Sequence, residues 1–150
     1  MAIKDTTRKP YIQDNDENVF VGIDLPFRKS EGILGWFEST STTIESVKNN
    51  IESLLKTETG DRIMQPNLGI GLKKYLFEQS TPEIKDFIQQ DIMEAFKSWL
   101  PFVQIKELII TLGDEQNNQF NVNTINIKII FNITRDPNTL ESVSVTVTGE

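Results

Sequence analysis

Residues 54–76 read LLKTETGDRIMQPNLGIGLKKYL, and this stretch sets the plan of the chain. It shows neither the helical period of about 3.6 residues nor the alternation of a strand. Its glycines can adopt positive φ angles or allow close backbone approach, and its proline fixes one φ and removes a donor. Loops of this length in compact domains tend to be functional or disordered. The apolar side chains of Met64, Leu68 and Ile70 predict that this loop is packed.

Composition narrows the class of protein. A chain of 150 residues predicts a single domain, and its net charge of −7 argues against a general nucleic-acid binder. The absence of Cys and His excludes disulfides, thiol nucleophiles, Ser-His and Cys-His arrangements and the usual zinc sites. We therefore expect no metal and no cofactor. No apolar run approaches the roughly 20 residues of a membrane span, and the charged first ten residues lack the apolar core of a secretory signal.

Two segments have helical periodicity. Thr42 and Glu45 form a capping-box pattern at the start of the first. Thr81 and Pro82 suit the start of the second, and Pro101 ends it. The apolar stripes predicted to face the core are Ile44, Val47, Ile51, Leu54 and Leu55 in the first helix, and Ile84, Phe87, Ile88, Ile92, Ala95, Phe96 and Trp99 in the second.

From residue 103 the period changes to two. Apolar residues alternate with polar ones through three segments, which are separated by polar turns at 113–118 and 135–138. This pattern predicts a three-stranded antiparallel meander with one buried face. The fold class is therefore α+β: two main helices packed on a small antiparallel sheet. We expect one domain over residues 41–150, preceded by an extended N-terminal arm at 1–40.

The arm shows no regular hydrophobic period, but it contains the aromatic residues Phe20, Phe27, Trp36 and Phe37. Two interpretations stay open: the arm wraps its own domain, or it becomes ordered only against a neighbour. Residues 14–18, DNDEN, invite a calcium loop, but they lack the Gly and distal Glu of that motif. A solvated polar run is the better interpretation.

The central stretch resembles the baseplate wedge family of contractile tails. That family includes the tail-lysozyme-like wedge protein of T-even-type phages and its counterpart in type VI secretion baseplates. Its pattern is a helix ending in L-L-x-T, then G-(E/S/D)-R, P-x-(F/L)-G and a short L-F-E segment. Here these motifs fall at residues 54–57, 60–62, 66–69 and 76–78, and the resemblance covers residues 21–110.

The resemblance implies a docking site on the helical core bundle of the other wedge subunits. The family carries Glu-Pro-Arg at the exit of the second helix, where this chain has Leu100-Pro101-Phe102. Loss of both charges puts an ionic contact in doubt and leaves an apolar corner, which alternatively only caps the core. The residues assigned to the wedge-core interface are Asp61, Arg62, Pro66, Gly69, Trp99, Leu100, Pro101 and Phe102.

The resemblance also implies a contact with the tail sheath protein. A sheet that ends in a free edge strand can accept a strand from another chain. The composition of residues 140–148 suits such a strand, with valines toward the core and Ser or Thr outward. The residues assigned to the sheath-facing strand are Val143, Ser144, Val145, Thr146 and Val147.

The function implied is structural. The chain resembles a wedge subunit that links the wedge core to the first sheath ring and initiates sheath assembly, without nucleic-acid or membrane partners. Its expected location is the virion tail, after synthesis in the host cytoplasm. The alternatives are a peptidoglycan-cleaving tail lysozyme and the equivalent subunit of a type VI or phage-derived injection device.

A lysozyme would need two suitably placed carboxylates. Glu58, Asp61 and Glu78 flank the central loop and are the best candidates, but their spacing does not single them out. An ion pair between Asp61 and Arg62, within the loop or at an interface, is the favoured interpretation of that motif.

Overall fold

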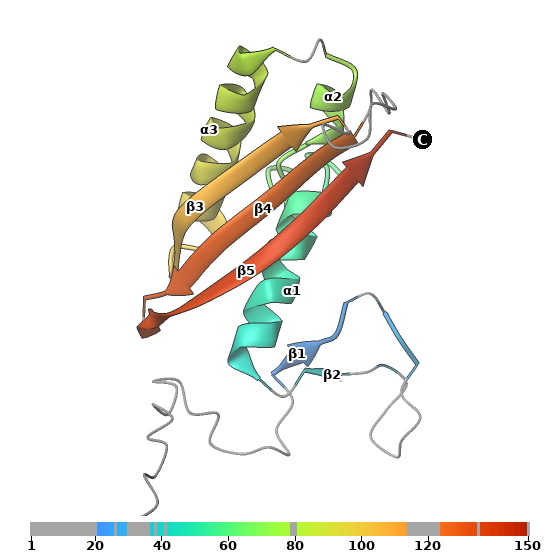
Figure 1. Ribbon diagram of the computed structural model, residues 1–150. Coiled ribbons are helices and arrows are strands. Elements are labelled where there is room, and N and C mark those ends of the chain that lie inside the picture. Colours follow the sequence, from blue (N-terminus) through green and yellow to red (C-terminus); the bar gives the residue numbers. More distant parts are fainter. Residues whose placement is uncertain are drawn as a thin grey trace, which may run out of the picture.

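A computed structural model describes residues 21–25, 27–29, 37, 39–40, 42–78, 81–113, 124–134 and 136–149. Within these ranges the elements run in the order β1 (Gly22–Ile23), β2 (Ser39–Thr40), α1 (Thr43–Lys56), α2 (Lys73–Leu76), α3 (Pro82–Trp99), β3 (Val103–Leu112), β4 (Thr124–Ile133) and β5 (Asp136–Thr148). The helices and the antiparallel sheet confirm the predicted α+β class (Figure 1).

The main sheet is the predicted meander, with strand order β3-β4-β5 and both pairings antiparallel. Ile127 in the central strand pairs with Ile110 of β3 on one side and Val145 of β5 on the other. Since paired residues project from the same face, this row places three apolar side chains together. The β3–β4 register shifts between Ile105 and Glu107, as expected of a β-bulge.

α1 and α3 lie on the same face of the sheet, with α3 against β3 and α1 against β5 (Figure 1). The apolar rows of the sheet meet the helical stripes between these layers and form one core. Its fully buried side chains include Ile51, Ile88, Ile92, Ile129 and Phe131. Burying each such side chain contributes roughly 1.5–3 kcal/mol, so this layer contact stabilises the fold.

The predicted starts of the helices differ in their capping. At α1 the Thr42 hydroxyl accepts a 3.4 Å hydrogen bond from the Glu45 N–H, which confirms half of the capping box. At α3 Thr81 is the N-cap residue, but its side chain makes no capping hydrogen bond. Pro82 occupies the first helical position, where a missing N–H costs nothing.

The predicted stripes are confirmed except at Phe87. That side chain is 56% exposed, whereas Ile84, Ile88, Ile92, Ala95 and Phe96 are buried. One residue turns a helix by about 100°, so Phe87 points well away from the direction of Ile88. Trp99 is half-buried against the core.

The described part of the arm packs on α1. β1 and β2 form a small antiparallel ladder, and the Asn49 side chain donates to the Ile23 carbonyl at 3.2 Å and to Asp24 at 3.4 Å. This part of the arm therefore contacts its own chain. Phe20, Trp36 and residues 14–18 lie outside the described residues, and the division into arm and domain stays a prediction. No helix in the described ranges has the length and apolarity needed to cross a membrane.

Candidate functional site

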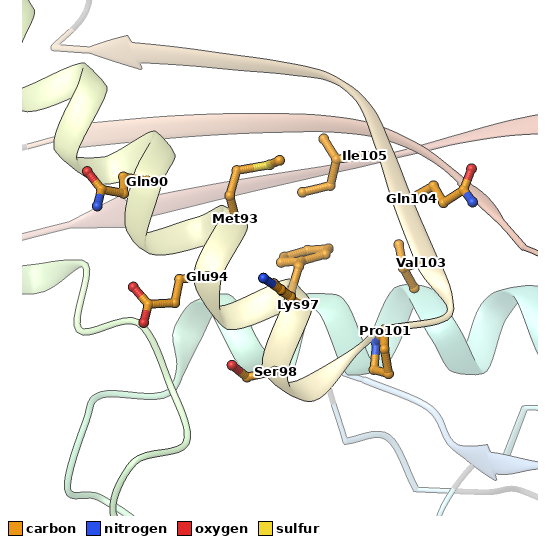
Figure 2. Close-up of a pocket in the computed structure, with 10 residues that line it drawn as sticks. Gln90, Met93, Glu94, Lys97, Ser98, Pro101, Val103, Gln104 and Ile105 are labelled. Atoms are coloured by element: carbon orange, nitrogen blue, oxygen red, sulfur yellow. The ribbon is translucent and has the colours of Figure 1, made fainter.

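Two shallow depressions meet on the C-terminal half of α3. The first, of about 890 Å³, lies between α3 and β3. Figure 2 shows Met93 of α3 and Ile105 of β3 extending toward one another within it. The second, of about 430 Å³, lies between α3 and the central loop. Glu94 and Ser98 line both depressions, so they form one continuous surface, which we call the α3 surface.

Several predicted wedge-core residues lie on the α3 surface. Pro101 lines the first depression, whereas Gly69 and Trp99 line the second. Phe102 follows Pro101, is 41% exposed, and is held by its carbonyl, which accepts hydrogen bonds from the backbone and side chain of Thr134. Leu100 differs, because it is 8% exposed and belongs to the core. An apolar contact at this corner therefore falls to Pro101 and Phe102.

The central loop is stiffened by turns. The Asp61 carboxylate accepts a 3.1 Å hydrogen bond from the Glu58 N–H, and the Asp61 N–H donates to the Glu58 carbonyl. The Gly60 N–H reaches the Pro66 carbonyl at 2.9 Å and closes the loop. The Glu58 carboxylate in turn accepts from the Lys73 N–H at the start of α2.

Asp61 and Arg62 do not form the predicted ion pair with each other. Asp61 is occupied by the Glu58 backbone, and the Arg62 guanidinium donates a long 3.4 Å hydrogen bond to the Ser53 hydroxyl of α1. Both side chains belong to exposed residues. The carboxylate makes a local hydrogen bond within its own turn, and the guanidinium remains exposed beside α1.

Gly69 lies close to the backbone of Thr57. Its φ is +110°, and a Cβ at this position would lie 2.3 Å from the Thr57 carbonyl oxygen. The next residue, Ile70, donates its N–H to the same carbonyl at 3.2 Å. Glycine is therefore required here for both conformation and space.

The loop tip is apolar and exposed. Ile63 is 94% exposed and Met64 is 92% exposed, so the prediction that Met64 packs the loop is wrong. A turn closed by the Gln65 N–H on the Arg62 carbonyl puts both residues at its centre, pointing away from the body. Ile70 is buried and Leu68 packs against the core, as predicted.

A polar cluster that the sequence pattern did not reveal joins α2 to α3. The Lys74 ammonium and the Tyr75 hydroxyl both donate to one oxygen of Asp91, at 2.8 and 2.7 Å. Partial burial raises the pKa of Asp91, but these two hydrogen bonds outweigh it and hold the pKa below its ordinary value. The hydrogen bond between Lys74 and Asp91 also raises the pKa of Lys74. Asp91 and Lys74 both line the second depression.

β5, which carries the residues assigned to the sheath-facing strand, is an edge strand of the main sheet. Val143, Val145 and Val147 are buried against the helices, while Ser144 and Thr146 are exposed. β5 pairs with β4 on one side only, and no other described strand covers its outer edge. The backbone donors and acceptors of that edge are thus available for another chain.

Comparison with known proteins identifies the family. Residues 41–138 match the family model described as baseplate wedge protein gp25. The chain belongs to the baseplate wedge family. It is also 25% identical over 108 residues to baseplate wedge protein gp25 of Enterobacteria phage T4, covering 71% of this chain and 76% of that protein.

Solved structures share the fold of this wedge protein at low identity. A protein of Geobacter sulfurreducens, provisionally named a tail lysozyme, gives a TM-score of 0.61 at 20% identity and covers 74% of this chain and 95% of its own. A chain of the sixfold-symmetrised anti-feeding prophage baseplate gives 0.60 at 23% identity, covering 77% and 86%. A chain of the type VI secretion baseplate complex gives 0.54 at 15% identity, covering 71% and 93%.

The wedge protein is therefore a structural component of a contractile tail baseplate, from a phage virion or a related device. The similarity to the Geobacter protein establishes a shared fold and no shared activity. Among the proposed acidic residues, Asp61 and Glu78 are exposed, and Glu58 holds the α2 backbone. Across the described ranges, no group of His, Cys, Asp and Glu is placed to hold a metal ion.

Proposed function

We propose that this wedge protein docks on the wedge core through the α3 surface and offers the free edge of β5 to the first ring of the tail sheath. Baseplates of the anti-feeding prophage and the type VI secretion system contain chains with this fold, which supports assembly with other baseplate subunits. Synthesis in the host cytoplasm, followed by incorporation into the tail, is part of the proposal.

The docking half rests on the position of the family motif. Residues 100–102 occupy the exit of α3, beside the first depression. Both charges of the family motif are absent here, while Pro101 and Phe102 remain accessible. We expect this subunit to dock by desolvation of an apolar corner, with Arg62 and the loop tip contacting the same partner from the other side of the surface.

The sheath half rests on one observation, the outer edge of β5, which no other described strand covers. An incoming strand can satisfy its backbone groups there only in register, which fixes both the position and the direction of the first sheath subunit. The valines hold β5 in the sheet, and the exposed serines and threonines keep it soluble until it is paired.

Proline substitutions test the edge. Successive N–H groups of a strand point to opposite sides, so one of Glu141→Pro and Ser142→Pro removes a bond to β4 while the other removes an edge donor. Glu141→Pro also removes the ion pair between Glu141 and Lys48. The variant that keeps the wild-type melting temperature should build baseplates that fail to nucleate sheath. Normal sheaths on those baseplates would contradict the proposal.

A second variant serves as a check that leaves the backbone unchanged. Ser144→Lys with Thr146→Lys places two charges on the strand, a device by which natural edges refuse pairing. Both positions are exposed, so the isolated domain should stay folded. Sheath nucleation should fall, while incorporation into the baseplate should be unchanged.

A further inference from the structure

The described part of the arm carries a basic aromatic patch, which consists of Phe27, Arg28, Lys29 and Phe37 and which we call the arm patch. The two phenylalanine rings contact each other at 5.7 Å between centroids, yet they are 67% and 56% exposed. Lys29 forms an antiparallel bridge with Phe37, so both side chains project from one face. Aromatic pairs of this size are normally buried.

The arm patch carries two positive charges, on Arg28 and Lys29. No carboxylate of the described residues lies within ion-pair distance of Arg28 or Lys29, in a chain whose net charge is −7. The patch precedes residue 41, where the family match begins. It therefore adds a surface to this wedge protein outside the part that matches the family. The chain just before the patch is held on α1 by the hydrogen bond from Asn49 to the Ile23 carbonyl.

A second surface has the opposite charge. Glu83, Asp86 and Phe87 lie at positions i, i+3 and i+4 of α3 and form one exposed face, which we call the α3-start patch. Neither carboxylate has an ion-pair partner in the part of the chain that the structure describes. This patch likewise has an exposed aromatic ring beside its charges.

The two patches lie at opposite ends of the molecule. α3 begins at the end away from the β1–β2 ladder, because α1 and α3 run in opposite directions along the sheet (Figure 1). A single chain therefore cannot bring its own patches together. Two copies can, with the arm patch of one on the α3-start patch of the next.

We propose that copies of this chain associate head-to-tail through these two patches. The aromatic rings bury each other, and Arg28 and Lys29 meet the carboxylates of Glu83 and Asp86. Such a contact is heterologous, so it closes into a ring when the rotation between copies allows it. Because two small patches bury little area, we expect a dissociation constant in the range of about 10 μM to 1 mM. Within an assembled baseplate, high local concentration would make this sufficient.

Sedimentation of the full chain tests the contact directly. Wild type should associate in proportion to concentration at low salt, and association should weaken as salt screens the charges. The variants Arg28→Glu/Lys29→Glu and Glu83→Lys/Asp86→Lys should each be monomeric, with dissociation constants at least about tenfold weaker, since like charges then face each other. An equimolar mixture of the two should associate again, because each supplies the surface that matches the other.

A matched control reverses two lysines elsewhere. Lys106→Glu/Lys128→Glu changes the net charge by the same amount as Arg28→Glu/Lys29→Glu, at exposed positions, and should associate as wild type does. Circular dichroism of every variant establishes that the fold is kept. A wild-type chain that stays monomeric up to about 1 mM at low salt would overturn the proposal, and so would a mixture no more associated than its components.

Discussion

The Tyr75 hydroxyl and the Asp91 carboxylate are joined by a 2.7 Å hydrogen bond that links α2 to α3. Lys74 donates to the same oxygen, and its ammonium lies 4.6 Å from the Tyr75 ring centroid. Two donor side chains of α2 thus meet at one acceptor on α3. The Asp91 side chain is about one-third exposed. Solvent screening therefore limits the contribution of the Lys74–Asp91 ion pair to stability to about 1 kcal/mol.

The pKa directions of this cluster predict a pH-dependent stability. The folded pKa of Asp91 is lowered, so its contribution is present above the unfolded pKa of about 3.9 and is lost as pH falls through the folded value. The folded pKa of Lys74 is raised, so its contribution is present below about 10.4 and is lost at higher pH. Asp91→Asn should lower stability by about 1 kcal/mol between these limits. The difference from wild type should shrink toward both extremes.

Urea unfolding of both proteins across pH measures this difference. Asp86→Asn is the matched control, because it removes an exposed carboxylate of the same helix that has no ion-pair partner among the described residues. A difference between Asp91→Asn and wild type that stays constant down to pH values well below about 3.9 would refute the assigned role of Asp91.

Alanine substitutions at Gly69 and Gly60 separate the cost of a positive φ from the cost of a steric clash. Both have positive φ, +110° and +99°. A Cβ at Gly60 meets open space, so Gly60→Ala should cost about 1–2 kcal/mol for the backbone conformation alone. At Gly69 the Cβ would also meet the Thr57 carbonyl at 2.3 Å, and Gly69→Ala should cost about 3–5 kcal/mol. Equal unfolding free energies for the two variants would show that the loop relaxes around the added methyl group.

The corner at the end of α3 separates stability from docking. Leu100 is in the core, so Leu100→Ala should lower the free energy of unfolding by about 2–5 kcal/mol. Phe102 is 41% exposed, and Phe102→Ala should cost about 1 kcal/mol but should abolish incorporation into the wedge. Calorimetry measures the first effect and co-purification with the other wedge subunits the second. If Phe102→Ala unfolds the isolated domain instead, the residue serves the core and the docking assignment loses its basis.

The fold was largely predictable because periodicity reports burial. The stripes of α1 and α3 and the alternating valines of β5 each repeat at the period of their element, so the residues that face the core can be read in order. Phe87 was wrongly included in the stripe of α3, because a residue next to Ile88 in sequence already points about 100° away from it around the helix. Periodicity cannot distinguish the edge of a stripe from the surface beside it.

The site was less predictable because loops carry no period. Met64 and Ile70 are both apolar, but Met64 lies in the exposed turn at residues 62–65, whereas Ile70 is buried beside the close approach at Gly69. Asp61 and Arg62 are neighbours in sequence, yet a backbone N–H lies nearer to the carboxylate. The link between Lys74 and Asp91 joins residues that only the packing of α2 on α3 brings together.

Arg62 gives the last prediction, about which side of the loop contacts the wedge. The hydrogen bond from its guanidinium to Ser53 is long at 3.4 Å and exposed, so Arg62→Ala should change the free energy of unfolding by less than about 0.5 kcal/mol. An exposed guanidinium, in the residue that precedes the apolar tip of Ile63 and Met64, is suited to bidentate contact with a partner's carboxylate. We therefore expect Arg62→Ala to fold normally and to reduce incorporation into the wedge, as measured by co-purification. Ser53→Ala is the control, because it removes the tether and keeps the charge, and it should incorporate normally. If both variants incorporate equally well, Arg62 does not contact the wedge. If both fail, the tether to α1 matters more than the exposed charge.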